Sequence, residues 1–272
     1  MLIAFIGGGN MATALISGLM KSRDPRLQVR VADPSADARI QLRSTFEVFV
    51  CSHAIEAAEG ADVIVLAVKP QVVAGVLAEL AGSIKPEQLI LSIAAGITIE
   101  AIVRHLGPRQ AVIRSMPNTP ALVGEGISGM YAGEYCRAHH RKQAERVLRA
   151  AGDVIWVEDE SLMDVVTAIS GSGPAYFFLL AEALAAAGVR LGLPEDVARQ
   201  LAEKTCAGTG AMLKNSDTGA AELRRRVSSP GGTTQAALEV LAQGKFSELV
   251  YMAAVAAEQR GKELALVPGP GI

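Results

Sequence analysis

Aromatic residues, cysteines and charge of one sign are all scarce in this chain. Phe, Trp and Tyr make up 4% of its 272 residues, and 26 Lys and Arg nearly balance 28 Asp and Glu, which leaves a formal net charge of −2. Such a balance lacks the basic footprint of a protein that binds nucleic acid or an anionic membrane. The three cysteines show no CxxC and no Cys/His ligand spacing, so we expect reduced thiols, no metal site and a cytoplasmic protein.

Long uninterrupted apolar runs are also missing. Residues 1–20 carry no charge, but they lack a basic leading segment and contain three consecutive glycines. Residues 165–181 are uncharged too, but they include Ser-Gly-Ser-Gly-Pro and only just reach the length of a membrane span. We therefore expect a soluble protein. Hydrophobic residues still make up 50% of the chain, beside 27 Gly, which excludes disorder.

The first half of the chain alternates short apolar runs with helical patterns. Residues 2–6 form an apolar run typical of a strand buried on both faces of a parallel sheet. Further strand-like runs occupy 29–32, 62–68, 89–93, 111–116 and 154–157, and helical patterns occupy 35–44, 72–80, 99–106 and 139–150. This alternation predicts an α/β fold with a Rossmann-type, doubly wound parallel sheet.

After about residue 158 the strand-like runs stop. Helical composition covers 161–191, 194–215, 220–227 and 233 onward, with breaks at Gly192, 217–219, 228–232 and Gly244. We therefore expect two domains, a dinucleotide-binding domain over residues 1–160 and an all-helical domain over residues 161–272.

The motif Gly7-x-Gly9-x-x-Ala12 fits the Rossmann fingerprint, with alanine at its third position. The first glycine permits a tight turn, the second lets the backbone approach a pyrophosphate, and the alanine lets the next helix pack closely. The helix N-terminus offers its amides and its positive dipole end to phosphates. The strand before the motif and the helix after it favour dinucleotide binding over a purely structural glycine turn.

Asp33 ends the second strand-like run, where an acidic side chain usually holds the ribose hydroxyls of NAD and repels a 2′-phosphate. Arg30 or Arg39 is near enough in the sequence to pair with such a phosphate. Asp33 followed by Pro34 is also typical of a simple turn. The residues alone leave the choice between NADH and NADPH open.

Three further motifs accompany these elements. The segments Ala67-Val68-Lys69-Pro70 and Met116-Pro117-Asn118-Thr119-Pro120 each close a strand, at the carboxyl edge of the sheet where ligands bind. Lys69 is a candidate for the cofactor cleft, although a lone loop lysine is more often solvated. The segment Ser170-Gly-Ser-Gly-Pro-Ala-Tyr176 interrupts the first helical stretch with small residues that let a backbone or a ligand come close.

The segment Ser228-Ser229-Pro230-Gly231-Gly232-Thr233-Thr234 is the most informative. A serine before proline at the start of an apolar-periodic helix predicts Ser229 as the N-cap and Pro230 as the first helical residue. The two glycines expose the amides of the first turn, which suit a carboxylate or a phosphate. A plain helix cap is the alternative, but it would need no second glycine.

In this order, GGGNMA, AVKP, MPNTP, SGSGPAY and SSPGGTT resemble the Δ1-pyrroline-5-carboxylate reductase family, from Ile3 to about Leu264. The resemblance implies an oxidoreductase that reduces 1-pyrroline-5-carboxylate to L-proline with NADPH or NADH, the last step of proline biosynthesis. It also implies a helical dimerisation domain that interlocks two subunits, with dimers that often assemble further into a pentamer of dimers.

The chain departs from that family at two places. Residues 223–227 read Leu-Arg-Arg-Arg-Val where the family often has a Leu-Lys-Asp-like stretch, so extra positive charge precedes the 228–234 segment. Many members also lack an acid at the position of Asp33. The resemblance slightly favours NADPH, and Asp33 leaves NADH open.

The motifs and the resemblance together give a set of site residues, with no metal ligands. We predict that the substrate is bound by Ser229, Gly231, Gly232, Thr233 and Thr234. We predict that the cofactor is bound by Ile6, Gly7, Gly8, Gly9, Asn10, Met11, Asp33, Pro34, Ala67, Val68, Lys69, Pro70 and Asn118. Ser229 and Thr234 are the predicted catalytic residues. The hypothesis is that amides near Gly232 hold the carboxylate and that Thr234 hydrogen-bonds the ring nitrogen, so that catalysis rests on positioning and hydride donation.

Two other classes of function compete with this one. The first is a different imine or hydroxyacid oxidoreductase on the same plan. A hydroxyacid enzyme would need a side chain to handle the hydroxyl proton. The 3-hydroxyacid dehydrogenases, which share this two-domain plan, place a catalytic lysine on the first helix of the second domain. All four histidines, however, lie outside the motifs, and residues 175–180 contain no lysine. A non-enzymatic nucleotide sensor or assembly protein would predict an eroded 229–234 segment, which is intact here.

Overall fold

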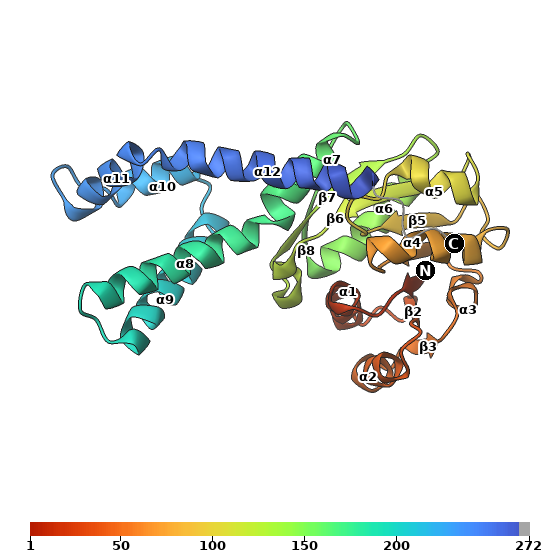
Figure 1. Ribbon diagram of the computed structural model, residues 1–272. Helices are drawn as coiled ribbons and strands as arrows, with labels where there is room; N and C mark the ends of the chain where they lie inside the picture. The colour runs from red at the N-terminus through yellow and green to blue at the C-terminus, as the bar shows by residue number, and fades with distance from the viewer. Residues whose placement is uncertain (267–272) are drawn as a thin grey trace. The chain divides into compact units, whose positions relative to one another are not determined.

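The computed structural model describes residues 1–266 and divides the chain into two compact units (Figure 1). The first comprises Met1–Ser172 together with the end of the last helix from Ala257, and the second comprises Gly173–Ala256. The first unit extends beyond residue 160 because α7 (Leu162–Val166) packs on the sheet. The division at residue 160 stays a prediction, and the last six residues of the expected second domain lie outside the described part.

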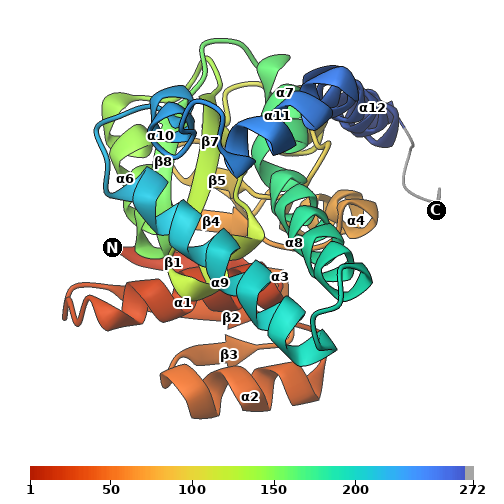
Figure 2. The same cartoon turned by 90° about the vertical axis from the view of Figure 1, so that its left-hand side faces the viewer.

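An eight-stranded sheet forms the centre of the first unit, with the strand order β3-β2-β1-β4-β5-β6-β7-β8 (Figure 2). Every neighbouring pair is parallel except β6 and β7, which run antiparallel. The strands are β1 (Leu2–Ile6), β2 (Gln28–Ala32), β3 (Phe49–Cys51), β4 (Val63–Leu66), β5 (Leu89–Ser92), β6 (Val112–Met116), β7 (Gly126–Ala132) and β8 (Gly152–Trp156).

Helices of the first unit cover both faces of this sheet, so the predicted doubly wound fold is confirmed. One apolar cluster includes Phe5 and Leu15, and the other includes Ala4, Ile64 and Leu77. The helices are α1 (Asn10–Lys21), α2 (Ala36–Phe46), α3 (Ala54–Ala58), α4 (Pro70–Leu80), α5 (Ile99–Leu106) and α6 (Ala138–Leu148), followed by α7. Shorter turns are the 3-10 segments η1 (Thr119–Val123) and η2 (Arg149–Ala151) and the π-helical turn η3 (Thr167–Gly171).

Two strands, β3 and β7, were not predicted, and the expectation of an entirely parallel sheet was wrong at β7. Strand β7 has the sequence GISGMYA, whose glycines are typical of a loop. Here they permit close packing, since a Cβ on Gly129 would lie 2.5 Å from Cγ1 of Val166. The strand runs antiparallel because the connection from β6 is too short for a crossover helix.

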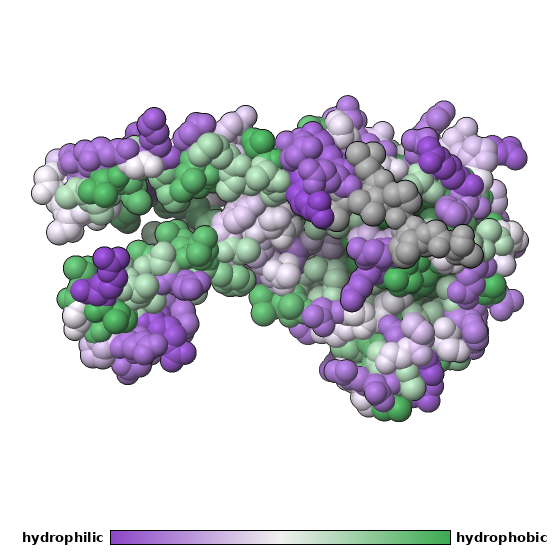
Figure 3. All heavy atoms as spheres, in the orientation of Figure 1, coloured by the Kyte–Doolittle hydropathy of each residue, from purple (hydrophilic) through white to green (hydrophobic). Residues whose placement is uncertain are grey.

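The second unit is helical throughout, as predicted. It contains α8 (Gly173–Arg190), α9 (Glu195–Lys214), α10 (Ala220–Arg226), α11 (Thr233–Gln243) and most of α12 (Phe246–Leu266). Large apolar side chains are exposed on it, including Phe178 (70%), Leu191 (88%) and Val240 (68%), and Figure 3 shows the apolar colour along these helices. An exposed apolar surface of this kind marks an interaction site.

Residues 162–190, which comprise α7, η3 and α8, are long and apolar enough to cross a membrane by length and composition alone. One such stretch is weak support for a membrane span, because helices that pack on protein pass the same test. The Ser-Gly-Ser-Gly-Pro segment breaks the regular helix within this stretch, and η3 lies there. The stretch therefore also fits a helix that packs on another subunit.

Candidate active site

The glycine loop follows β1 and begins α1. Gly7 has a φ of +101°, and a Cβ at this position would lie 2.6 Å from the carbonyl oxygen of Ala67, so the turn requires glycine. Gly9 is the N-cap of α1, and a Cβ there would meet nothing within 4 Å, which leaves open space in front of the helix. No side chain caps this helix, so its first amides face that space. Ala12 is 1% exposed and packs against the core.

Asp33 connects the end of β2 to this loop. Its Oδ2 accepts a hydrogen bond of 2.8 Å from the amide of Gly8, and its Oδ1 accepts one of 2.9 Å from the amide of Ser35. The carboxylate therefore stabilises both the glycine loop and the turn into α2. The turn-forming role and a ribose-binding role are compatible, because both place the carboxylate beside the glycine loop.

Of the two arginines that were candidates for a phosphate, Arg39 lies at the β2–α2 turn. Its Nη1 donates to the carbonyl oxygens of Asp33 (2.7 Å) and Pro34 (2.9 Å). Arg30 instead donates to the carbonyl of Glu59 at 2.9 Å, and its guanidinium lies over the ring of Phe49. Only the Arg39 guanidinium is therefore bonded to the backbone of the β2–α2 turn.

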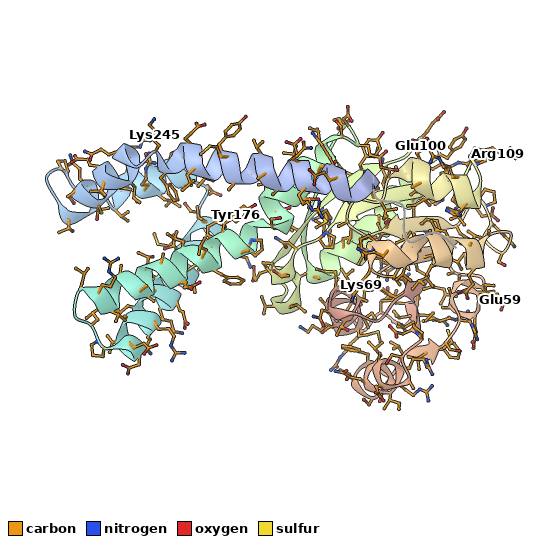
Figure 4. All side chains as sticks on the ribbon, in the orientation of Figure 1. Glu59, Lys69, Glu100, Arg109, Tyr176 and Lys245 are labelled. Atoms are coloured by element: carbon orange, nitrogen blue, oxygen red, sulfur yellow. The ribbon has the colours of Figure 1, made fainter. Side chains whose placement is uncertain are left out.

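The segment Ala67–Pro70 follows β4, the strand beside β1. Lys69 is the exposed N-cap residue of α4, and Pro70 is the first helical residue (Figure 4). Strands β1 and β4 are neighbours, and the strand order reverses between them. In a doubly wound sheet, a dinucleotide binds in the crevice at the carboxyl ends of such a pair of strands. The predicted residues of the glycine loop, the β2 end and the β4 end thus gather at one edge of the sheet.

Asn118 follows β6, but its side chain is directed into the protein. It is 8% exposed, its Nδ2 donates to the carbonyl of Ser170 at 3.1 Å, and its Oδ1 accepts from the amide of Ile127 at 2.9 Å. The cofactor contact predicted for this residue would therefore fall to its backbone. Sequence reasoning missed these side-chain bonds, since nothing in the spacing links Asn118 with Ser170.

The 228–234 segment has a different local structure from the one predicted. Helix α11 begins at Thr233 with Gly232 as its N-cap, so the assignment of Ser229 as N-cap and Pro230 as first helical residue was wrong. The amide of Gly232 donates to the carbonyl of Ser229 at 3.0 Å, and Gly231 has a φ of +70°. Proline followed by a glycine of positive φ is the type II turn pattern, and that turn precedes the helix.

One side chain at this turn was missed by the sequence reasoning. The Oε1 of Gln235 accepts a 2.8 Å hydrogen bond from the amide of Gly231, and its Nε2 donates to Glu239 at 2.9 Å. The four-residue spacing of Gln235 from Gly231 was the available signal. With the amides of Gly231 and Gly232 used within the turn, the helix offers a ligand the amides of Thr233 and Thr234.

The arginine run before this turn is partly neutralised. Arg225 forms an ion pair with Glu222, and the Nε of Arg226 lies 3.2 Å from Oε1 of the same glutamate. All three arginines lie in the last turn of α10. The excess positive charge of this short helix favours anions near the 228–234 segment.

Histidine, the commonest acid–base group, is not part of these motifs. His140 is buried, its Nδ1 accepts from the amide of Arg137 at 3.1 Å, and burial lowers its pKa. It therefore caps α6 as a neutral ring. Within residues 1–266 no group of three or more His, Cys, Asp or Glu side chains is placed to hold a metal ion. In the first unit the glycine loop provides a crevice for a dinucleotide, the cofactor of hydride transfer. In the second unit the 228–234 turn provides helix amides suited to an anion.

A Rossmann sheet with an open glycine loop, followed by a helical unit with an amide-lined turn, defines a dinucleotide-dependent oxidoreductase. The family model described as pyrroline-5-carboxylate reductase dimerisation matches residues 160–264, and the model described as NADP oxidoreductase coenzyme F420-dependent matches residues 2–96. The pyrroline-5-carboxylate reductase of Pseudomonas aeruginosa is 48% identical over 263 residues, which cover 97% of this chain and 96% of that protein. The chain belongs to the pyrroline-5-carboxylate reductase family.

Solved structures agree with this assignment. The pyrroline-5-carboxylate reductase of Coxiella burnetii is 38% identical and matches with a TM-score of 0.92, over 98% of this chain and 99% of that one. The Plasmodium falciparum pyrroline carboxylate reductase, solved with NADP bound, is 30% identical with a TM-score of 0.82, over 97% of each chain. The predicted family and fold class are thereby confirmed.

Proposed function

We propose that this protein reduces 1-pyrroline-5-carboxylate to L-proline with NADPH or NADH, the last step of proline biosynthesis. The observation that carries the proposal is the 229–234 turn, where helix amides suited to a carboxylate adjoin a threonine hydroxyl. A 48% identical reductase that matches 97% of the chain supports the substrate class.

The crevice at β1 and β4 fits a dinucleotide. Gly7 permits the tight turn, and the open space at Gly9 leaves room for a pyrophosphate at the N-terminus of α1. When bound, the nicotinamide cofactor supplies the hydride. We propose that the cofactor is held by the predicted residues Ile6, Gly7, Gly8, Gly9, Asn10, Met11, Asp33, Pro34, Ala67, Val68, Lys69, Pro70 and the backbone of Asn118.

The substrate carboxylate is proposed to bind at the N-terminus of α11. The amides of Thr233 and Thr234 and the hydroxyl of Ser229 donate to it, while Gly231 and Gly232 shape the turn. The Thr234 hydroxyl hydrogen-bonds the ring nitrogen and orients the C=N carbon. A protonated imine needs no further strong acid, which agrees with the absence of histidine from the motifs.

We propose that the working protein is a cytoplasmic homodimer formed through its helical unit, with a pentamer of dimers as the full assembly. The exposed apolar side chains of α8, α11 and α12 support the dimer, because water contact with that surface is costly. The matched dimerisation model over residues 160–264 covers the same helices.

The dimer is tested at Phe178, which is 70% exposed on α8. We expect Phe178→Asp to weaken self-association by at least about 100-fold, because the interface would bury an unpaired charge. Light scattering measures the mass, and reductase activity is assayed at the same protein concentrations. Ile40→Asp is the matched control, because Ile40 is 67% exposed on α2 of the other unit. A wild-type protein that is a fully active monomer would contradict the proposed dimer.

The function itself is tested by following the oxidation of NADPH and of NADH, at equal concentrations, with 1-pyrroline-5-carboxylate. We expect turnover with at least one of them and formation of L-proline. A 3-hydroxy acid with NADP⁺ or NAD⁺ serves as the competing reaction, and no turnover is expected because residues 175–180 lack a lysine. If the imine is not reduced with either cofactor, the proposed function is wrong.

A further inference from the structure

The π turn η3 lies between α7 and α8 in an otherwise continuous helical stretch. Its register is shown by the amide of Ser172, which donates to the carbonyl of Thr167, five residues earlier, at 2.8 Å. The α-helix resumes at Gly173, and in its four-residue register the carbonyl of Ser170 would accept from residue 174. That residue is Pro174, which has no N–H. The half-buried Ser170 carbonyl therefore lacks its usual helical donor.

Asn118 provides a donor for this carbonyl from 52 residues away. Its Nδ2 lies 3.1 Å from the Ser170 oxygen, while its Oδ1 accepts from the amide of Ile127 at the start of β7. Asn118 is also the N-cap residue of η1, but its side chain makes no capping bond there. Its amide group is thus shared between two backbone groups of other elements, and its burial keeps water from replacing either bond.

Other contacts hold the same segment against the end of β6. A Cβ on Gly171 would lie 2.7 Å from Cε of Met116, so these two residues are closely packed. Arg114 lies on β6 and is 7% exposed, and its Nη1 lies 2.7 Å from Oε1 of Glu160. The same Oε1 also accepts a hydrogen bond of 2.8 Å from the amide of Ile99. Residues 160–172 and the loop after β6 therefore form one closely packed body within the first unit.

We propose that Asn118 is a positioning residue that replaces the missing amide of Pro174 and thereby holds residues 116–120 in place at the carboxyl edge of the sheet. Two elements depend on it, because loss of the side chain would leave both the Ser170 carbonyl and the Ile127 amide without a partner. The catalytic half of the proposal rests on the proposed reductase function, in which this edge receives the cofactor. The structural half, the compensation for Pro174, does not.

The compensation is tested by a double-mutant cycle of Asn118→Ala and Pro174→Ala, measured by thermal unfolding of the full-length protein. We expect Asn118→Ala to lower the Tm by roughly 3–8 °C, because two backbone groups lose their partner. Pro174→Ala restores an N–H, so the double variant should recover part of that loss. The effect of Pro174→Ala on the unfolded chain is the same in both backgrounds and cancels in the cycle.

Asn215→Ala is the matched control, since the Nδ2 of Asn215 donates to the carbonyl of Ala211 at 2.9 Å on an exposed helix end. Its Tm should stay within about 1 °C of the wild type. Additive effects of Asn118→Ala and Pro174→Ala, or a loss no larger than that of Asn215→Ala, would overturn the compensation. If Asn118→Ala does not fold, recovery of folded protein in the double variant supports it and continued misfolding overturns it.

Steady-state kinetics then test positioning. At a temperature well below every Tm, we expect Asn118→Ala to lower kcat about 10-fold, because a displaced loop misaligns the reacting groups. The KM for the cofactor should change less than kcat, since the glycine loop and Asp33 are untouched, and the double variant should regain kcat. An unchanged kcat would overturn the positioning role. A wild-type protein without reductase activity would overturn the proposed function and the positioning role, while the unfolding cycle would still decide the compensation.

Discussion

Replacement of Thr234 by Val is expected to lower kcat about 10–100-fold, because the ring nitrogen would lose a hydrogen bond to a charged group worth about 1.5–3 kcal/mol. Valine keeps the shape of threonine and replaces the hydroxyl by a methyl group. Thr234 is the second residue of α11, beside the amides proposed to hold the carboxylate. The KM for 1-pyrroline-5-carboxylate should rise less than kcat falls, since those amides remain.

Two variants make this test specific. Thr234→Ser keeps a hydroxyl and should retain most of the turnover. Thr209→Val is the matched control, because the Thr209 hydroxyl donates to the carbonyl of Thr205 at 2.8 Å on the exposed side of α9. It should leave kcat unchanged. If Thr234→Val turns over at the wild-type rate, Thr234 has no part in the reaction.

The second large effect is expected at Asp33, in the choice between the two cofactors. Asp33→Asn removes a negative charge beside the proposed position of the adenosine ribose. We expect the ratio of kcat/KM for NADPH over NADH to rise about 10-fold or more, because the repulsion of two charges about 4 Å apart is worth ~1 kcal/mol in water and ~4 kcal/mol near a protein surface. Initial rates measured at saturating imine over a range of concentrations of each cofactor give this ratio.

The two neighbouring arginines provide the controls for this test. Arg39 is bonded to the backbone of the β2–α2 turn, where its guanidinium is the candidate partner of a 2′-phosphate. Arg39→Met should therefore lower the ratio of kcat/KM for NADPH over NADH. Arg30 is bonded to Glu59 instead, so Arg30→Met should leave the ratio unchanged. A ratio that does not respond to Asp33→Asn would reduce Asp33 to its role in the turn, where it accepts from Gly8 and Ser35.

Local sequence was sufficient for those parts of the fold whose pattern is complete within one segment. Strands β1, β4 and β5 were predicted because burial on both faces makes them continuous apolar runs. The glycine fingerprint was predicted because a turn with positive φ at Gly7 requires glycine whatever surrounds it. The breaks between helices of the second half follow from the same kind of local chemistry.

Other features could not be predicted because their cause lies elsewhere in the chain. Strand β7 has the composition of a loop, and its glycines are explained only by Val166 packing against Gly129. The start of α11 was misplaced because Pro230 suits both a first helical residue and a type II turn. The positive φ of Gly231 and its bond to Gln235 in the folded chain decide for the turn.

By itself the sequence determined the family, the Rossmann sheet with its glycine loop, and a helical second half, since each depends on residue types at short spacing. The tertiary structure decided what the polar side chains at the site do. Asp33 stabilises the glycine loop, Arg39 rather than Arg30 lies at that turn, and Asn118 serves the carbonyl that Pro174 cannot. The physical reason is that a hydrogen bond has no sequence period: its partner is whichever group the fold brings within about 3 Å.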